Sequence, residues 1–239
     1  MPREARSPAV LPAFATTFSI VHEADAADEP EPLFPTVLLP ARLRSAARRR
    51  RAEFLAGRFC AQEALRAAGF ADGAATLDAL PGGGPFWPPG VVGAITHTRT
   101  FASAAVARAD DALSLGIDAE LLVPHDQAAE VRSSIALPGE LEAAAAVATS
   151  LEEALTLVFS AKESVYKCLH PLVGRYFDYL DAAVALAADG SFEATLHVDL
   201  APAFPEGTRL RGKFAVEPPH VHTGIALVRA PARGGAGRP

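Results

Sequence analysis

The chain of 239 residues lacks the features that identify several common protein classes. Its two cysteines, Cys60 and Cys168, form no Cys-x-x-Cys pair and no Cys/His cluster at zinc spacing, so the sequence indicates a reducing compartment, and we expect the cytoplasm. No stretch approaches the roughly 20 apolar residues that cross a membrane. The net charge of −6 gives no overall basic field for nucleic acid. We therefore expect a soluble protein with neither a membrane nor a nucleic-acid partner.

Lysine is also scarce, with three residues against nineteen arginines. Two of the three, Lys162 and Lys167, lie five residues apart in "FSAKESVYK". An ammonium is a compact charge, whereas a guanidinium is a planar fork, and the two are not interchangeable at a site. A sequence that otherwise uses arginine so freely favours a chemical role for these two lysines.

The segment 151–170, "LEEALTLVFSAKESVYKCLH", predicts an amphipathic helix. Ser150 and Glu153 have the spacing of a capping box at its start. Lys162 falls within the apolar stripe, where an unpaired ammonium is costly, so it must reach solvent, meet an anion or face a wet cleft. Glu163 and Lys167 are four residues apart and would by themselves indicate a surface ion pair.

The remaining pattern alternates between helices and strands, which predicts an α/β (α+β) fold. Half of the residues are hydrophobic, enough to bury a real core. The N-terminal stretch "FATTFSIV" alternates like a strand, which we favour over a signal peptide. We expect an N-terminal lobe at residues 1–110, a C-terminal lobe at 111–230 and a disordered tail at 231–239. The further expected elements are a helix within 45–69, with Ser45 as its N-cap and Gly69 as its C-terminal stop, strands at 91–98, 101–108 and 111–122, a hairpin with an Asp-Gly turn at 182–198, and strands at 209–217 and 222–230.

In "LSLGIDAELL" an apolar run ends at Asp118 and Glu120. Residues two apart in a strand point to the same side, so both carboxylates can approach one cation. Hard oxygen ligands suit Mg²⁺, whose other positions are taken by water and phosphate. The pair alone also suits a strand that ends in a polar loop. Together with Glu163 and the two lysines, it predicts three acids for a metal ion and two ammonium groups for the anion that the metal holds.

Arg51 and Arg58 lie two helical turns apart in the segment "RRAEFLAGR" and share one face. A guanidinium can bind a phosphate bidentately, although a solvated basic face is the simpler interpretation. His97 alone would more often be a structural histidine.

Four blocks of the sequence resemble a known family. "GIDAE" and, about forty residues later, "FSAKESVYK" look like the two signature motifs of the 4′-phosphopantetheinyl transferases of the surfactin-synthetase type. "RRAEFLAGR" and "FWPPGVVGAITHT" resemble two motifs of the siderophore-synthetase subgroup. The blocks occur in the family's order and span residues 49–167.

The resemblance implies a pseudo-two-fold pair of α/β lobes, each a small, mainly antiparallel sheet packed with a long helix, with coenzyme A between them. It implies Mg²⁺-dependent transfer of 4′-phosphopantetheine from coenzyme A to a serine of an apo acyl- or peptidyl-carrier protein, with release of adenosine 3′,5′-bisphosphate. Mn²⁺ is the alternative ion. The subgroup usually serves nonribosomal-peptide, polyketide and siderophore biosynthesis, and a site between two lobes of one chain needs no second copy, so we expect a monomer.

Site residues follow from the resemblance position by position. Asp118, Glu120 and Glu163 match the metal ligands, with Glu163 or a metal-bound hydroxide as the base. Lys162 and Lys167 match lysines near the pyrophosphate and the reacting serine. The coenzyme A-binding residues are expected to be Arg51, Arg58, Thr96, His97, Lys162 and Lys167.

The sequence departs from the subgroup at residues 81–84, where "PGGG" replaces a basic residue. Arg42, Arg44 or glycine N–H groups would have to supply that phosphate contact. Two other functions stay open from the residues alone: another Mg²⁺-dependent phosphohydrolase or phosphodiesterase, and a non-catalytic module that binds RNA or acidic proteins through 48–51. The first lacks an obvious water-activating motif, and the acidic net charge opposes the second.

Overall fold

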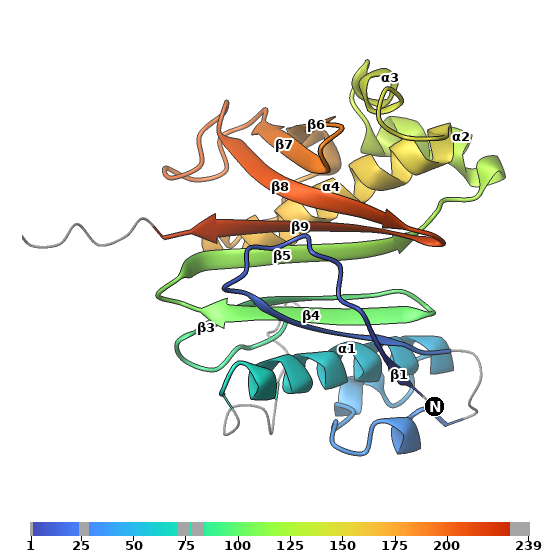
Figure 1. Cartoon of the computed structure of the whole chain (residues 1–239), viewed down its shortest axis with the longest axis vertical. Helices are drawn as coiled ribbons and strands as arrows, with labels where there is room; N and C mark the ends of the chain where they lie inside the picture. The colour runs from blue at the N-terminus through green and yellow to red at the C-terminus, as the bar shows by residue number, and fades with distance from the viewer. Residues whose placement is uncertain (1, 24–28, 71–76, 78–83, 230–239) are drawn as a thin grey trace, which may run out of the picture.

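The computed structural model describes residues 2–23, 29–70, 77 and 84–229. The tail expected at 231–239 and most of the "PGGG" segment, residues 81–83, lie outside the described residues. Figure 1 shows two sheets, each with a long helix on one side, α1 with the first sheet and α4 with the second. The predicted fold class is therefore confirmed.

The N-terminal sheet is antiparallel and has the strand order β1-β2-β4-β3. Its helix, α1, packs across β2 and β4 with a face of small and branched side chains, among them Leu55, Ala56 and Leu65, which are fully buried. The elements of this half are β1 (Arg3–Ala5), β2 (Thr16–Val21), η1 (Glu31–Leu33), η2 (Ala41–Leu43), α1 (Arg48–Ala67), β3 (Val91–His97) and β4 (Phe101–Arg108).

The two ends of α1 differ in how they are capped. Gly69 follows the helix with φ of +83°, a left-handed conformation that glycine adopts freely, as its position predicts. The expected cap at Ser45 is wrong, because the N-cap is Ala47, which offers no side-chain hydrogen bond. The helix therefore starts at Arg48, two residues later than a cap at Ser45 would place it.

The C-terminal sheet has the order β5-β9-β8-β7-β6 and is also antiparallel. The Asp-Gly turn between β6 and β7 forms the predicted hairpin. The elements of this half are β5 (Ala112–Leu121), α2 (His125–Ile135), α3 (Glu140–Ala144), α4 (Leu151–Val173), η4 (Tyr179–Asp181), β6 (Ala182–Leu186), β7 (Ser191–Leu196), β8 (Arg209–Glu217) and β9 (His220–Val228).

The long helix α4 begins as predicted, with Ser150 Oγ accepting the N–H of Glu153 at 3.1 Å. The reciprocal half of the capping box is replaced, since the Glu153 carboxylate accepts the N–H and hydroxyl of Thr149 at 3.3 and 2.6 Å. The helix ends at Gly174, with φ of +69°. This capped helix carries both lysines of the predicted site.

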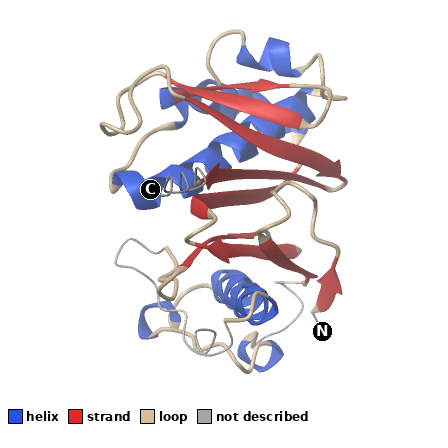
Figure 2. Ribbon diagram, turned by 60° about the vertical axis from the view of Figure 1, so that its left-hand side comes forward, coloured by secondary structure: helices blue, strands red, loops and turns tan. Residues whose placement is uncertain are grey.

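The two halves meet where β3 lies beside β5, and Figure 2 shows the two sheets following one another between α1 and α4. The Ala119 N–H donates to Thr96 Oγ1 at 3.0 Å across this junction. On the other side of β5, a Cβ added to Gly116 would overlap the Ser164 carbonyl oxygen of α4. Glycine thus lets β5 approach α4 closely, two residues before Asp118. No described helix is long and apolar enough to cross a membrane.

Candidate active site

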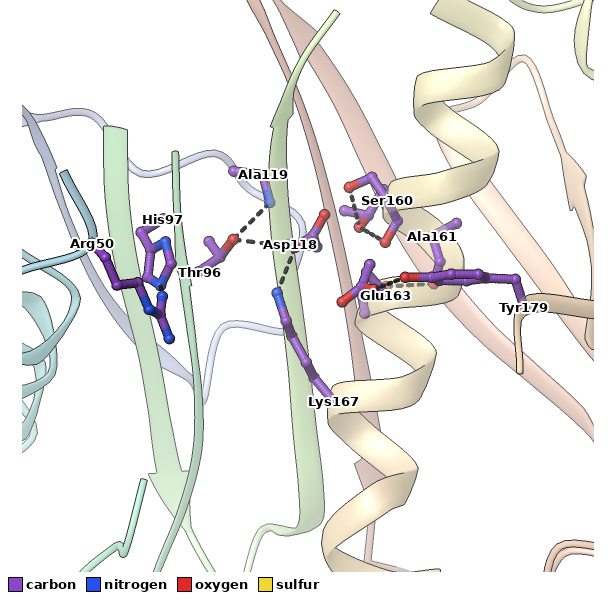
Figure 3. Close-up of polar contacts among 12 residues, drawn as sticks. Arg50, Thr96, His97, Asp118, Ala119, Ser160, Ala161, Glu163, Lys167 and Tyr179 are labelled. Carbon is purple, nitrogen blue, oxygen red and sulfur yellow. Dashed lines mark hydrogen bonds and ion pairs between the residues drawn. The ribbon is translucent and has the colours of Figure 1, made fainter. Parts of the chain in front are cut away.

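Asp118, near the end of β5, is the centre of a polar cluster between the two halves (Figure 3). Its Oδ1 accepts Lys167 Nζ at 2.5 Å and Thr96 Oγ1 at 3.2 Å. Only 2% of Asp118 is exposed, and its Oδ2 is buried without a hydrogen-bond partner among the described residues. One carboxylate oxygen is therefore occupied and the other remains available for a ligand.

Glu163 approaches this cluster from α4, one turn before Lys167. Its Oε1 accepts the Tyr179 hydroxyl at 2.5 Å, and Figure 3 shows Tyr179 reaching it from the side away from β5. The other expected acid, Glu120, lies two residues after Asp118 on β5 and is partly exposed. The charges of Glu120 and Glu163 influence each other, which brings the three predicted acids into one electrostatic group.

The surplus of negative charge changes the ionisation of this group. Burial, reinforced by Asp118 and Glu163 and partly opposed by Lys167, raises the pKa of Glu120 to about 8. Burial alone would lower the pKa of Lys167, but Asp118, Glu163 and Glu120 outweigh it and raise the pKa above its ordinary value. A further positive charge would therefore stabilise the ionised acids.

The donor set fits a hard divalent cation by its chemistry. It consists of carboxylate oxygens that repel one another, and one of them, Asp118 Oδ2, is buried and has no described partner. The arrangement is not a preformed metal site, since no group of three His, Cys, Asp or Glu residues among the described residues is placed to hold an ion. Lys167 and Tyr179 instead occupy one oxygen each of Asp118 and Glu163.

Thr96 and His97 end β3 at the same junction, as the sequence predicted for the site. Burial, with contributions from Lys167 and Arg50, lowers the pKa of His97 to about 4, although Glu53 opposes the shift. The imidazole is therefore neutral near pH 7. Its Nε2 lies 3.4 Å from Arg50 Nη1.

The structure overturns the expected orientation of Lys162. Its ammonium does not face the cluster but donates to Ile135 O and Glu140 Oε2, each at 2.8 Å. The Lys162 side chain is 2% exposed and that of Glu140 4% exposed. Burial lowers the pKa of Lys162, and Glu140 opposes the shift. Lys162 does meet an anion, but this anion is the carboxylate of Glu140 and not a ligand. The two residues form a structural ion pair between α4 and α3.

The two arginines expected at the nucleotide end of coenzyme A both lie on α1 and contact groups of the N-terminal half. Arg51 Nη1 contacts Glu31 Oε1 at 2.8 Å and Glu29 Oε2 at 3.2 Å, in the acidic segment at the start of η1. Arg58 is buried with its guanidinium 4.9 Å from the centre of the Phe54 ring. The helix register places the neighbouring Arg50 next to His97 instead.

Sequence reasoning missed Arg50 and Glu53, which act on His97 from α1. Their signal was present: positions 50, 53 and 57 lie on one helical face, and a Cβ at Gly57 would be 2.8 Å from Ile95 Cγ2 and 3.5 Å from His97 Cδ2. A small residue on an otherwise charged face can indicate where a helix touches a strand.

It also missed an aromatic cavity of about 150 Å³ beside Glu163. Its walls include Tyr166, Tyr176, Phe177 and Tyr179, from α4 and from the segment that follows it. Tyr166 lies within the signature motif and the other three residues follow it by nine or more positions, so no local pattern links them. The cavity and the acidic cluster share Glu163.

The fold and the site together define an enzyme of two similar halves, with acids and a lysine at their junction. A family profile described as the 4′-phosphopantetheinyl transferase N-terminal domain matches residues 39–107, and one described as the 4′-phosphopantetheinyl transferase superfamily matches 114–217. The chain belongs to the 4′-phosphopantetheinyl transferase family and is a transferase. This excludes the non-catalytic binding module.

Curated relatives cover nearly the whole chain. The 4′-phosphopantetheinyl transferase Svp of Streptomyces mobaraensis is 41% identical over 234 residues, which cover 94% of this chain and 89% of Svp. PptT of Mycobacterium tuberculosis is 35% identical over 229 residues, 91% of this chain and 96% of PptT. Enterobactin synthase component D of Salmonella typhimurium is 42% identical over 130 residues, 53% of this chain and 51% of that protein.

Proposed function

We propose that this enzyme transfers 4′-phosphopantetheine from coenzyme A to a serine of an apo carrier protein, with Mg²⁺ as the metal ion and as a monomer. The observation that carries the proposal is the Asp118–Lys167 pair with Glu163 beside it, in a chain of this family. In the reaction the serine oxygen bonds to the phosphorus that bears pantetheine. The bridging P–O bond breaks, and adenosine 3′,5′-bisphosphate leaves.

Asp118, Glu120 and Glu163 would hold the metal ion. When bound, Mg²⁺ supplies positive charge to the pyrophosphate oxygens as the leaving group departs. The ammonium of Lys167 carries its charge at the same place, since three acids hold it protonated above its ordinary pKa. This combination favours loss of a phosphate leaving group without a covalent enzyme intermediate.

Glu163 is the residue best placed to accept the serine proton. Its Oε1 already takes the hydroxyl of Tyr179, so Oε2 is the oxygen left for the proton. A carboxylate within reach of the attacking hydroxyl suits a general base.

The nucleotide end of coenzyme A would lie toward α1. Arg50 contacts the neutral ring of His97, and Arg51 lies next to it in sequence. The arrangement supports His97 as a hydrogen-bonding group rather than a second cation. Arg51 becomes a phosphate ligand once the ion pairs with Glu29 and Glu31 are exchanged for a ligand phosphate.

The pantetheine arm would enter the aromatic cavity at Glu163. The arm is a flexible chain of methylene and amide groups, and aromatic walls with a few polar groups suit such a ligand. An arm in this cavity would have one end beside the acids, because Glu163 belongs to both the cavity and the acidic cluster. Carriers of nonribosomal-peptide, polyketide and siderophore pathways are the proposed acceptors, and a relative named for enterobactin synthase supports this choice.

The test is incubation with coenzyme A, Mg²⁺ and apo carrier proteins, followed by intact mass measurement. We expect one phosphopantetheine to be added to an acyl- or peptidyl-carrier substrate, and EDTA to abolish the addition. Hydrolysis of coenzyme A without transfer would instead favour the phosphohydrolase. No addition to any of several carriers would contradict the proposal.

A further inference from the structure

Tyr179 contacts Glu163 but is not one of the predicted site residues. It starts η4, sixteen residues after Glu163, and its hydroxyl donates to Glu163 Oε1 at 2.5 Å. A hydroxyl bonded to an ionised carboxylate at this length belongs to the stronger class of hydrogen bonds. The bond joins a residue of the signature motif to one that no motif contains.

The position of Tyr179 is fixed at both its ring and its backbone. The ring packs against Phe159 of α4 at 5.4 Å between centroids, one turn before Glu163. In the backbone, the Asp178 N–H donates to Asp181 Oδ2 and the His197 N–H donates to Asp181 O, each at 2.8 Å. The hydroxyl is therefore presented by a turn tied to the sheet.

A glutamate held in this way has less freedom than its three side-chain torsions would allow. An unrestrained glutamate loses rotamer entropy when it is ordered, and this loss is among the largest of the side chains. The Tyr179 bond orders Oε1 before any substrate arrives and leaves Oε2 toward the cluster, where the charge of Glu163 already acts on Glu120 and Lys167. Prior ordering of a reacting group is a recognised contribution to rate.

Tyr179 also forms part of the aromatic cavity. Its ring faces the cavity while its hydroxyl holds Glu163, as Figure 3 shows for the hydroxyl. A ligand in the cavity would therefore touch Tyr179, the residue that holds the Glu163 carboxylate in position.

We propose that Tyr179 is a positioning residue that holds the Glu163 carboxylate in its reactive orientation and connects the occupied cavity to the acidic cluster. The proposal rests on the proposed transferase function. Tyr179 acts through Glu163 and takes no part in bond making, so its loss should slow turnover more than it weakens coenzyme A binding.

The first experiment compares Tyr179→Phe with Thr149→Val. Both changes delete a hydroxyl that donates to a glutamate of α4, but Thr149 holds Glu153 at the far end of the helix. For Tyr179→Phe we expect kcat to fall about 10- to 100-fold, the size that a hydrogen bond to a charged group supports. KM for coenzyme A should change less than about threefold, and Thr149→Val should leave kcat unchanged.

The second experiment measures Mn²⁺ binding by electron paramagnetic resonance in a double-mutant cycle with Glu163→Gln. We expect Tyr179→Phe to weaken Mn²⁺ by about three- to tenfold in the wild-type background and by less than twofold in the Glu163→Gln background. This coupling distinguishes action through Glu163 from a general loss of structure, which would weaken Mn²⁺ equally in both backgrounds.

Equal losses in the two backgrounds, or a kcat for Tyr179→Phe within twofold of the wild-type value, would overturn the role of Tyr179. Those results leave transfer by the wild-type enzyme intact. Failure of the wild-type enzyme to modify any carrier would instead overturn the proposed function, and with it the proposal that depends on it.

Discussion

The two lysines of α4 form two buried ion pairs that differ in how completely they are satisfied. The Lys162–Glu140 pair is closed: Glu140 also accepts the Leu137 N–H at 2.7 Å and the Val184 N–H at 2.5 Å. The Lys167–Asp118 pair is open, with 28% of the lysine side chain exposed and a carboxylate oxygen that has no described partner.

The pKa shifts of the lysines separate the pairs further. Burial dominates at Lys162 and lowers its pKa, whereas Asp118, Glu163 and Glu120 outweigh burial at Lys167 and raise its pKa. One cation with one acid makes a structural contact, while one cation among three acids leaves a charge imbalance that a ligand can use. The same residue type on the same helix therefore forms a structural contact in one pair and carries a proposed chemical role in the other.

The largest expected effect is on the open side. Glu163→Gln removes the proposed base and one metal ligand, so transfer should fall about 10²- to 10⁴-fold, while the affinity for coenzyme A falls much less. Carrier modification by mass spectrometry and coenzyme A binding by calorimetry measure the two quantities. Glu142→Gln, an exposed glutamate of α3, is the matched control and should be fully active. Full activity of Glu163→Gln would remove this residue from the mechanism.

On the closed side we expect a loss of stability. Lys162→Met leaves Glu140 buried with its charge uncompensated, which should lower the free energy of unfolding by about 3–5 kcal/mol in urea titrations. Adding Glu140→Gln should recover part of that loss.

Magnesium gives this comparison a second readout. Mg²⁺ should stabilise Lys167→Met more than it stabilises the wild type, because the ion replaces a missing charge at the cluster, whereas Lys162→Met should gain only as much from Mg²⁺ as the wild type. Equal responses to Mg²⁺ in the two variants would mean that the pairs do not differ as described.

A change of pH should also act on the open side, through His97. Its pKa is about 4 in the folded chain, against an ordinary value of 6.5, so the unfolded chain binds more protons between these values. The free energy of unfolding should therefore fall as pH drops from about 6.5 to about 4. His97→Gln should reduce this slope by up to about 1.4 kcal/mol per pH unit, measured by urea unfolding at pH 5 and 7. An unchanged slope would contradict the assignment, and His125→Gln, at an exposed ring, should not flatten it.

The smallest expected effect concerns the acidic segment next to Arg51. Removing both competing carboxylates with Glu29→Gln and Glu31→Gln should tighten coenzyme A binding by up to about fivefold, since exposed ion pairs contribute about 0.2–1 kcal/mol. The gain should disappear with 3′-dephospho-coenzyme A if Arg51 binds that phosphate. Weaker binding by the double variant would show that the segment supports Arg51 instead of competing for it.

The sequence predicted the positions of strands and helices, which local periodicity determines. The alternation at Asp118 and Glu120 predicted a strand with both acids near its end, and the cap at Ser150 predicted the start of α4. Thr96, an expected coenzyme A-binding residue, contacts Asp118, and His97 follows it at the end of β3.

The errors came from partners supplied by distant segments. The stripe showed that Lys162 needed a charge partner, but Glu140 comes from another helix, 22 residues earlier. The basic face of α1 was predicted, but the contact of Arg50 with His97 was not, because it depends on a strand 47 residues away in the sequence. Tyr179 has no local signal at all, because its role exists only once the turn folds back onto α4.

The close approach at Gly116 means that a hydrogen atom acts as the spacer between the strand that carries Asp118 and the helix that carries Lys167. The backbone therefore sets the distance between the strand and the helix, and exchanging either charged side chain would not change that distance. A methyl group at position 116 would overlap the Ser164 carbonyl oxygen and force the whole strand to move. Substitutions should therefore be tolerated more readily in the cavity walls than at this contact.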